Sequence, residues 1–270
     1  MTDFLLLFIM GLVGGLLAGL IGIGGGVMYI LVLPYLLIGM GFPDQEIVQY
    51  TIANSIFGTM FAALSGTTAL VRKGNFFWKE VLIIGVWGTV SALLVLQFIV
   101  NTSLYNKTQF NYVVIVIMAF IAIRTLIQVK RESGGQHEIN PKSLGLSLVG
   151  VAAGSVSALS GLGGGTVIIP ILNSGIKMSM QKAKGISLGV IFITALSLTV
   201  FNLFEDPKTD FVNQSTGYIV WPLALMISFG VIIGSPLGVI IGRRLSNRTI
   251  SYIFVLFVLV VIADKVIQLI

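Results

Sequence analysis

The sequence predicts an all-α polytopic membrane protein with two inverted-topology repeats, each a Gly-broken helical hairpin followed by three transmembrane helices. Of its 270 residues, 56% are apolar and only 10% are charged, and the mean hydropathy is +1.02. So little polar surface cannot cover a soluble globule of this size. About eight apolar segments follow one another, in runs of about twenty residues that suit helices crossing the bilayer. The short alternating strands of a lipid-facing barrel are not seen.

Charge and reactive residues narrow the classes of function. The net charge is +6, but the basic residues occupy short loops between apolar runs, where they report membrane orientation. We therefore expect the protein to contact the lipid bilayer and not to bind nucleic acid. Cysteine is absent, which excludes disulfides, thiolate metal sites and cysteine nucleophiles. His137 is the one histidine and lies in a polar loop, so we predict no metal, no cofactor and no catalytic residues.

The first half begins with an apolar run that is too long for one perpendicular span. It covers residues 4–40 and is interrupted near its middle by the glycine-rich residues 22–26. Because a single crossing needs about twenty residues, we expect two helices joined by a glycine break. Further apolar segments follow at residues 47–71, 81–100 and 110–129.

The second half repeats this order. A broken apolar segment at 144–172 is followed by segments at 185–204, 218–241 and 250–270. When residues 11–27 are placed on 150–166, seven of seventeen positions are identical, and both triple glycines coincide. This is an internal repeat. We assign the first repeat to residues 1–132, a polar linker to 133–142 and the second repeat to 143–270.

The distribution of charge decides how the halves are oriented. If each broken segment crossed the membrane once, the halves would be parallel, and the basic loop residues would divide seven against seven. If each is a hairpin that returns to its own side, twelve basic residues fall on one side and only Lys107 and Lys208 on the other. The second division follows the positive-inside rule. We therefore predict inverted repeats in the cell membrane, with both termini outside.

The two glycine clusters are the first candidates for a binding site. Inverted hairpins would bring their glycine tips towards each other inside the membrane. The backbone N–H groups that open the second helix of each hairpin have no carbonyl one turn back to bond to. Each helix start also carries roughly half a positive charge, so the two tips together favour an anion. The candidate glycines are Gly24, Gly25, Gly26, Gly163, Gly164 and Gly165.

Close helix packing is the alternative explanation for glycine. It suits the spaced glycines at 11, 15 and 19, at 150 and 154, and at 230, 234, 238 and 242, which form small-residue helix faces. Three adjacent glycines are a poor way to build such a face, because glycine weakens a helix. We therefore assign packing to the spaced glycines and a functional break to the clusters.

Polar residues inside apolar runs complete the candidate site. Each costs free energy unless it faces protein or a water-filled cavity. For a serine or threonine, a bond to the carbonyl one turn back is the structural alternative. The candidates near the glycine tips are Asn54, Ser55, Ser160, Thr166 and Ser187. Asn54 and Ser55, near the start of the second apolar segment, pair with Ile186 and Ser187, near the start of the sixth.

In the second half, residues 161–170 read GLGGGTVIIP and residues 182–187 read KAKGIS. With the glycine cluster of the first half, these segments resemble the sulfite exporter TauE/SafE family of membrane transporters: the first looks like the family motif and the second like the segment that follows it. The first half departs from this pattern, because Pro34 lies three residues later relative to its glycines than Pro170 does. The resemblance covers nearly the whole chain. It implies transport of a small sulfur-containing anion, such as sulfite or an organosulfonate.

The sequence thus predicts a secondary transporter that works by alternating access, with an anion held between the glycine tips. Protons are a candidate coupling ion, with Asp264 as a candidate carrier. A channel or carrier for another small anion or solute is the alternative within transport. A membrane enzyme is disfavoured because no serine–histidine pair or pair of intramembrane carboxylates exists. A purely structural protein does not explain duplicated broken helices, and the oligomeric state, including a homo-oligomer, is left open.

Overall fold

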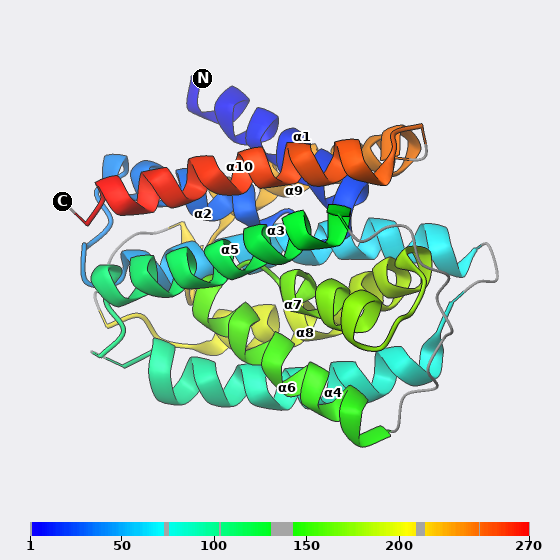
Figure 1. Cartoon of the computed structure of the whole chain (residues 1–270). Coiled ribbons are helices and arrows are strands. Elements are labelled where there is room, and N and C mark those ends of the chain that lie inside the picture. The colour runs from blue at the N-terminus through cyan, green and yellow to red at the C-terminus, as the bar shows by residue number, and fades with distance from the viewer. Residues whose placement is uncertain are drawn as a thin grey trace.

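A computed structural model describes residues 2–72, 76–102, 104–130, 143–208, 214–242 and 244–269. Helices dominate this part of the chain (Figure 1). Those of the first half are α1 (Thr2–Ile21), α2 (Gly26–Gly39), α3 (Ile47–Val71), α4 (Trp78–Val95), the π-helical turn η1 (Leu96–Val100) and α5 (Lys107–Lys130). The second half contains α6 (Ser143–Ser160), α7 (Gly165–Pro170), the π-helical turn η2 (Ile171–Gly175), α8 (Met180–Phe204), strands β1 (Ser215–Thr216) and β2 (Ile219–Val220), α9 (Trp221–Gly242) and α10 (Asn247–Ile267).

The polytopic helical fold is confirmed, and most elements lie where the apolar runs placed them. Helix α3 has the predicted limits, whereas α8 begins at Met180, before the predicted start at 185. The short antiparallel pair β1–β2 was not predicted. The whole linker, residues 133–142 with His137, lies outside the described residues, and the limits of the two repeats stay a prediction.

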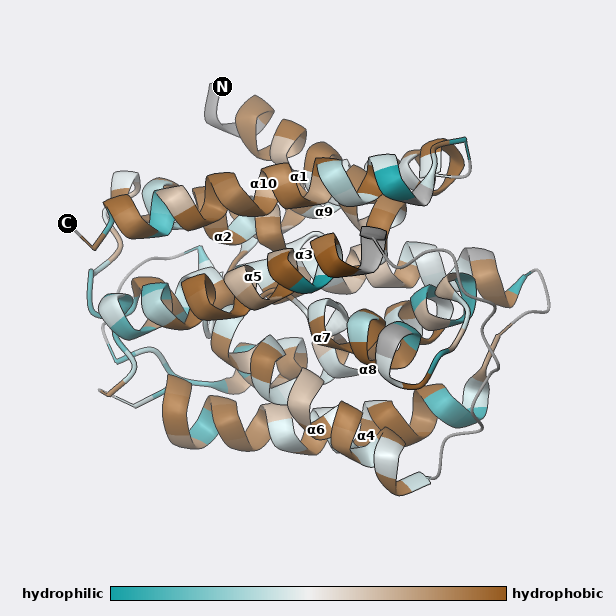
Figure 2. Cartoon of the chain, viewed as in Figure 1, coloured by the Kyte–Doolittle hydropathy of each residue, from teal (hydrophilic) through white to brown (hydrophobic). Residues whose placement is uncertain are grey.

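Seven of the described helices are long and apolar enough to cross a membrane, and α1 and α2 contribute shorter apolar stretches. Helix α3 lies at the centre, since 89% of its apolar window is buried, compared with 33% for α5 and for α10. Figure 2 shows hydrophobic residues along the length of the outer helices. On α4, exposed apolar residues recur one turn apart at Leu82, Val86, Val90 and Leu94. Such a stripe fits contact with lipid.

Corresponding helices of the two halves run in opposite directions. On α3 and α8, Gly66 lies beside Leu188 while Leu70, further along α3, lies beside Gly185, nearer the start of α8. Helices α5 and α10 also lie side by side and run in opposite directions (Figure 1), and Asn111 near the start of α5 donates to Gln268 just after α10 at 3.4 Å. Two halves related in this way have inverted topology.

Contacts between loops agree with the inverted arrangement. Lys182 at the start of α8 lies 3.8 Å from the Glu80 carboxylate at the start of α4, and its amine lies 5.0 Å from the centre of the Phe77 ring. Parallel halves would have put these two segments on opposite sides of the membrane. At the other end of the bundle, the backbone N–H of Lys208 donates to Glu46 at 2.8 Å.

The halves are joined by exchanged helices, which explains the spaced glycines. Helix α1 packs on α9 of the other half, and α6 packs on α4. A side chain at Gly11 would overlap the carbonyl of Ile227, and one at Gly154 would overlap the carbonyl of Gly88. The same holds for Gly230, Gly234 and Gly238 of α9 against α1, whereas a Cβ atom on Gly242 would make only ordinary contact with Leu20 at 3.5 Å. The prediction that the spaced glycines serve close packing is confirmed.

Candidate functional site

The first glycine tip turns the chain back between α1 and α2. Gly22, Gly24 and Gly25 have φ angles of 85°, 98° and 75°. A side chain is strained in this left-handed region, so glycine allows the helix to end and the next to begin within a few residues. Helix α2 starts at Gly26, directly after the left-handed Gly25.

The second tip follows nearly the same path between α6 and α7. Gly161 and Gly163 have φ angles of 69° and 71°, and α7 starts at Gly165. Gly164, which corresponds to Gly25, has a φ of −46° and is not left-handed. The two tips are therefore similar in their first turn and different in the residue before the second helix.

The two tips touch each other inside the bundle, as expected for inverted hairpins. A Cβ atom placed on Gly26 would lie 2.5 Å from the carbonyl oxygen of Gly161, and one on Gly165 would lie 3.0 Å from that of Gly22. Residues 22–27 and 161–166 are all buried. In this conformation, the backbone of each tip fills the space in front of the other.

Two serines, one for each tip, bond that tip to the opposite half. The Ser55 hydroxyl on α3 donates to the carbonyl of Gly161 at 2.7 Å, and the Ser187 hydroxyl on α8 donates to the carbonyl of Gly22 at 3.1 Å. Both serines are fully buried. Their matching partners show that Ser55 and Ser187 are counterparts, as the sequence pairing predicted. In this conformation, both hydroxyls bridge the halves.

Thr59 and Ile191, one turn further along α3 and α8, were not predicted as part of the site. A Cβ atom on Gly24 or on Gly163 would lie 2.7 Å from the Thr59 methyl and 3.5 Å from Ile191. The two residues thus contact both tips. The Thr59 hydroxyl is buried and has no hydrogen-bond partner among the described residues. The sequence signal that could have identified them is their spacing, because Thr59 lies four residues after Ser55 and Ile191 four residues after Ser187.

Asn54 lies next to Ser55 but faces the β1–β2 segment. Its amide donates to the carbonyls of Tyr50 and Tyr218 at 2.8 and 3.0 Å, and its oxygen accepts from the N–H of Val220 at 3.0 Å. Tyr218 in turn donates to Glu46 at 2.9 Å, and burial, followed by this bond, raises the pKa of the Tyr218 hydroxyl. Asn54 therefore anchors a loop here, and its role in binding stays a prediction.

Ser160 and Thr166 stand on either side of the second tip. The Ser160 hydroxyl donates to the carbonyl of Val156 at 2.6 Å and accepts from the N–H of Leu162 at 3.3 Å, so it ends helix α6. The Thr166 side chain is 1% exposed, and its hydroxyl has no partner among the described residues. A buried hydroxyl without a partner costs free energy, which makes Thr166 the more available of the two.

Lys184 is a residue of the site that sequence reasoning missed. It was counted among basic loop residues, but α8 begins at Met180, so Lys184 lies in the second turn of that helix. Its amine donates to the carbonyl of Leu20 at 3.1 Å, and a Cβ atom on Gly22 would lie 3.2 Å from its Cγ. A lysine therefore lies beside the first tip.

Asp264 belongs to a separate cluster at the end of α10. It accepts hydrogen bonds from Tyr35 of α2 at 2.5 Å and from Gln268 at 2.9 Å, and it pairs with Lys265 at 3.1 Å. These contacts link α2 to α10. Proton coupling through Asp264 stays a prediction.

Two inverted halves, with broken helices that meet inside an apolar helical bundle, define a polytopic membrane protein of the kind found among secondary transporters. Residues 7–264 match the family described as Sulfite exporter TauE/SafE. The chain belongs to this family, and it is a multi-pass membrane transporter.

Relatives along nearly the full length agree with this class. The chain is 30% identical to a probable membrane transporter protein of Methanocaldococcus jannaschii over 90% of this chain and 88% of the relative. It is 25% identical to a probable membrane transporter protein of Haemophilus influenzae over 96% and 97% of the two chains. It is 23% identical to the probable membrane transporter protein YunE of Bacillus subtilis over 93% of each.

Proposed function

We propose that the protein is a secondary transporter that carries a small sulfur-containing oxyanion, sulfite or an organosulfonate, across the cell membrane by alternating access. The observation that carries this proposal is the contact between the two glycine tips, where Gly26 meets Gly161 and Gly165 meets Gly22. The family description, Sulfite exporter, supports the substrate class. The names of the relatives support membrane transport without a stated substrate.

The anion would bind where the tips separate. Helix α2 begins at the first tip, and its first N–H groups carry partial positive charge that favours an oxyanion. Glycine allows the ligand to approach the backbone closely. The proposed binding residues are Gly24, Gly25, Gly26, Asn54, Ser55, Ser160, Gly163, Gly164, Gly165, Thr166 and Ser187.

The two serine bonds support alternating access. Ser55 ties the second tip to α3, and Ser187 ties the first tip to α8. Opening from one side would break one of these bonds while the other holds. The closed contact between the tips supports a carrier over an open channel. No covalent step is required, and protons are the proposed coupling ion.

The proposal is tested by sulfite flux into proteoliposomes that contain the purified protein. We expect saturable flux in the wild type and its loss in Gly26→Ala, because the added methyl group lies 2.5 Å from the Gly161 carbonyl. Gly39→Ala is the matched control, since a Cβ atom there meets nothing within 4 Å. Absence of saturable flux of sulfite, sulfate, thiosulfate, taurine and sulfoacetate in the wild type would refute the proposal.

We also propose that both termini lie outside the cell. The chain contains no cysteine, so single cysteines report the side from which a loop is labelled. We expect Arg72→Cys and Gly175→Cys to react only from the cytoplasm, and Leu104→Cys, at a position 77% exposed, to react from outside. Labelling of the Arg72→Cys variant from outside would show that the orientation is the reverse of the proposed one.

A further inference from the structure

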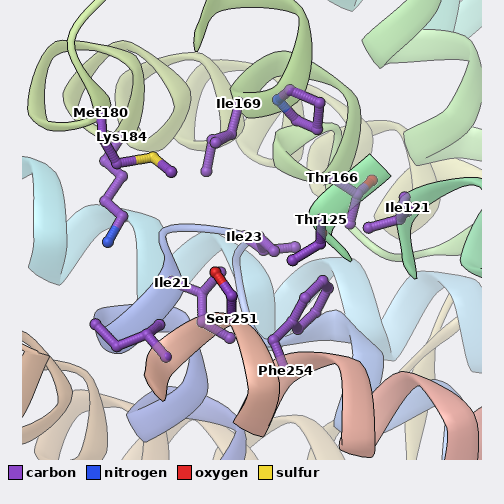
Figure 3. Close-up of a pocket in the computed structure, with 12 residues that line it drawn as sticks. Ile21, Ile23, Ile121, Thr125, Thr166, Ile169, Met180, Lys184, Ser251 and Phe254 are labelled. Atoms are coloured by element: carbon purple, nitrogen blue, oxygen red, sulfur yellow. The ribbon is translucent and has the colours of Figure 1, made fainter. Parts of the chain in front are cut away.

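A small cavity lies beside the first tip, between elements of both halves. Its volume is about 50 Å³. Figure 3 shows Ile21 and Ile23 of the first tip, Lys184 of α8, Thr166 of α7 and Phe254 of α10 around it. Helix α5 closes another part of the wall. The cavity thus adjoins both tips.

The polar groups of this cavity suit an anion. Among the described residues, its lining is apolar apart from Thr125, Thr166, Lys184 and Ser251, and none of the lining residues is a carboxylate. Three hydroxyls and one ammonium group can all donate hydrogen bonds. A cation would find no charged ligand here. The Thr166 hydroxyl is buried without a partner among the described residues, so an anion in the cavity would supply the acceptor that it lacks.

Lys184 brings a positive charge to the wall of this cavity. Among the described residues, Lys182 pairs with Glu80 and Lys265 with Asp264, whereas no carboxylate pairs with Lys184. Its amine donates to the Leu20 carbonyl, at the end of α1. A cation at this point also compensates the negative end of the α1 dipole. A lysine without a carboxylate partner in a membrane-spanning helix is costly, which makes Lys184 a candidate for a functional role.

We propose that this cavity binds the transported oxyanion, with the charge of the ion held by Lys184 and its oxygens by the hydroxyls of Thr166 and Ser251. The inference rests on the proposed function and makes it more specific. A cavity of this volume has room for about three to five water molecules. That size fits an inorganic ion such as sulfite better than the longer taurine or sulfoacetate.

The test measures sulfite binding to the purified protein in detergent, from the sulfite dependence of its thermal unfolding, and sulfite flux in proteoliposomes. We expect Lys184→Met to weaken the apparent affinity at least about tenfold, since hydrogen bonds from charged groups are the stronger ones. Lys184→Arg keeps the charge and should retain binding within a few-fold. Lys182→Met is the matched control, because that lysine pairs with Glu80 away from the cavity.

The outcomes separate this inference from the function on which it rests. If the wild type binds and transports sulfite, and Lys184→Met and Thr166→Val both bind it as tightly as the wild type, the cavity is not the site and the transport proposal stands. If Lys184→Met does not fold, the same comparison is made with Thr166→Val and Ser251→Ala. Binding of taurine as tight as that of sulfite would contradict this size preference. If the wild type neither binds nor transports any oxyanion, both proposals fail.

Discussion

The two glycine tips share a backbone path, a serine bond and a pair of neighbours, but differ in the residue that faces their first glycine. Three residues before Ser187, Lys184 lies against Gly22, and three residues before Ser55, Ile52 lies against Gly161. Ile52 is fully buried, whereas Lys184 borders a cavity. The shared features hold the tips together, and the unshared lysine gives one tip a charge. Duplication thus accounts for the scaffold, and divergence accounts for the site proposed here.

A second difference lies one residue before the serines. Asn54 of the first half makes three hydrogen bonds, two of them to the β1–β2 segment, while its counterpart Ile186 is a buried apolar residue. The end of the bundle near Glu46 is therefore fastened by a polar anchor. At the other end of the bundle, Lys184, which lies close to Ile186 on α8, borders the cavity. We therefore predict that, in the proposed alternating access, the Lys184 side opens first.

The largest effect is expected at this anchor. Asn54→Leu leaves the buried Tyr218 carbonyl and the Val220 N–H without partners, at about 1–3 kcal/mol for each group. We expect the free energy of unfolding to fall by several kcal/mol, measured by thermal unfolding in detergent. Ile186→Val, at the corresponding position, should cost about 0.5–1.5 kcal/mol. Equal losses of unfolding free energy in the two variants would show that Asn54 stabilises its half no more than Ile186 stabilises the other.

The overall fold was largely predictable because it depends on apolar periodicity, internal repetition and loop charge. The limits of α3 and the inverted orientation follow from such patterns. The same patterns placed the tips together and paired Ser55 with Ser187. They could not reveal that Asn54 faces the β1–β2 segment, because a two-residue strand has no period to detect. Lys184 was missed because a basic residue near a helix start looks like a loop residue until the helix limit is known.

The next effect concerns the residue before the second helix of each hairpin. A Cβ atom on Gly25 would lie 2.6 Å from the Gly14 carbonyl oxygen, and one on Gly164 would lie 2.7 Å from that of Ala153. Steric overlap is thus similar, but Gly25 has a φ of 75° and Gly164 one of −46°. We expect Gly25→Ala to be more destabilising than Gly164→Ala by about 1–2 kcal/mol, the cost of a left-handed side-chain residue. A larger loss for Gly164→Ala in thermal unfolding would contradict this difference between the tips.

The smallest difference between the two halves is expected for the two serine bonds. Ser55→Ala and Ser187→Ala each leave one buried tip carbonyl without its hydroxyl donor, which costs about 1–3 kcal/mol. The Ser55 bond is 2.7 Å long and the Ser187 bond 3.1 Å, so Ser55→Ala should cost more. Thr194→Val on α8 is a suitable control, because that hydroxyl donates only within its own helix, to the carbonyls of Val190 and Ile191.

The serine pair also tests the order of opening, because each bond ties one tip to the opposite half. If the Lys184 side opens first, the bond from Ser187 to Gly22 breaks early, and Ser187→Ala should favour that open state. A cysteine at the cavity-lining Ser251 would then be labelled faster in the Ser187→Ala background than in the Ser55→Ala background. Faster labelling in the Ser55→Ala background would mean that the Asn54 anchor does not set which side opens first.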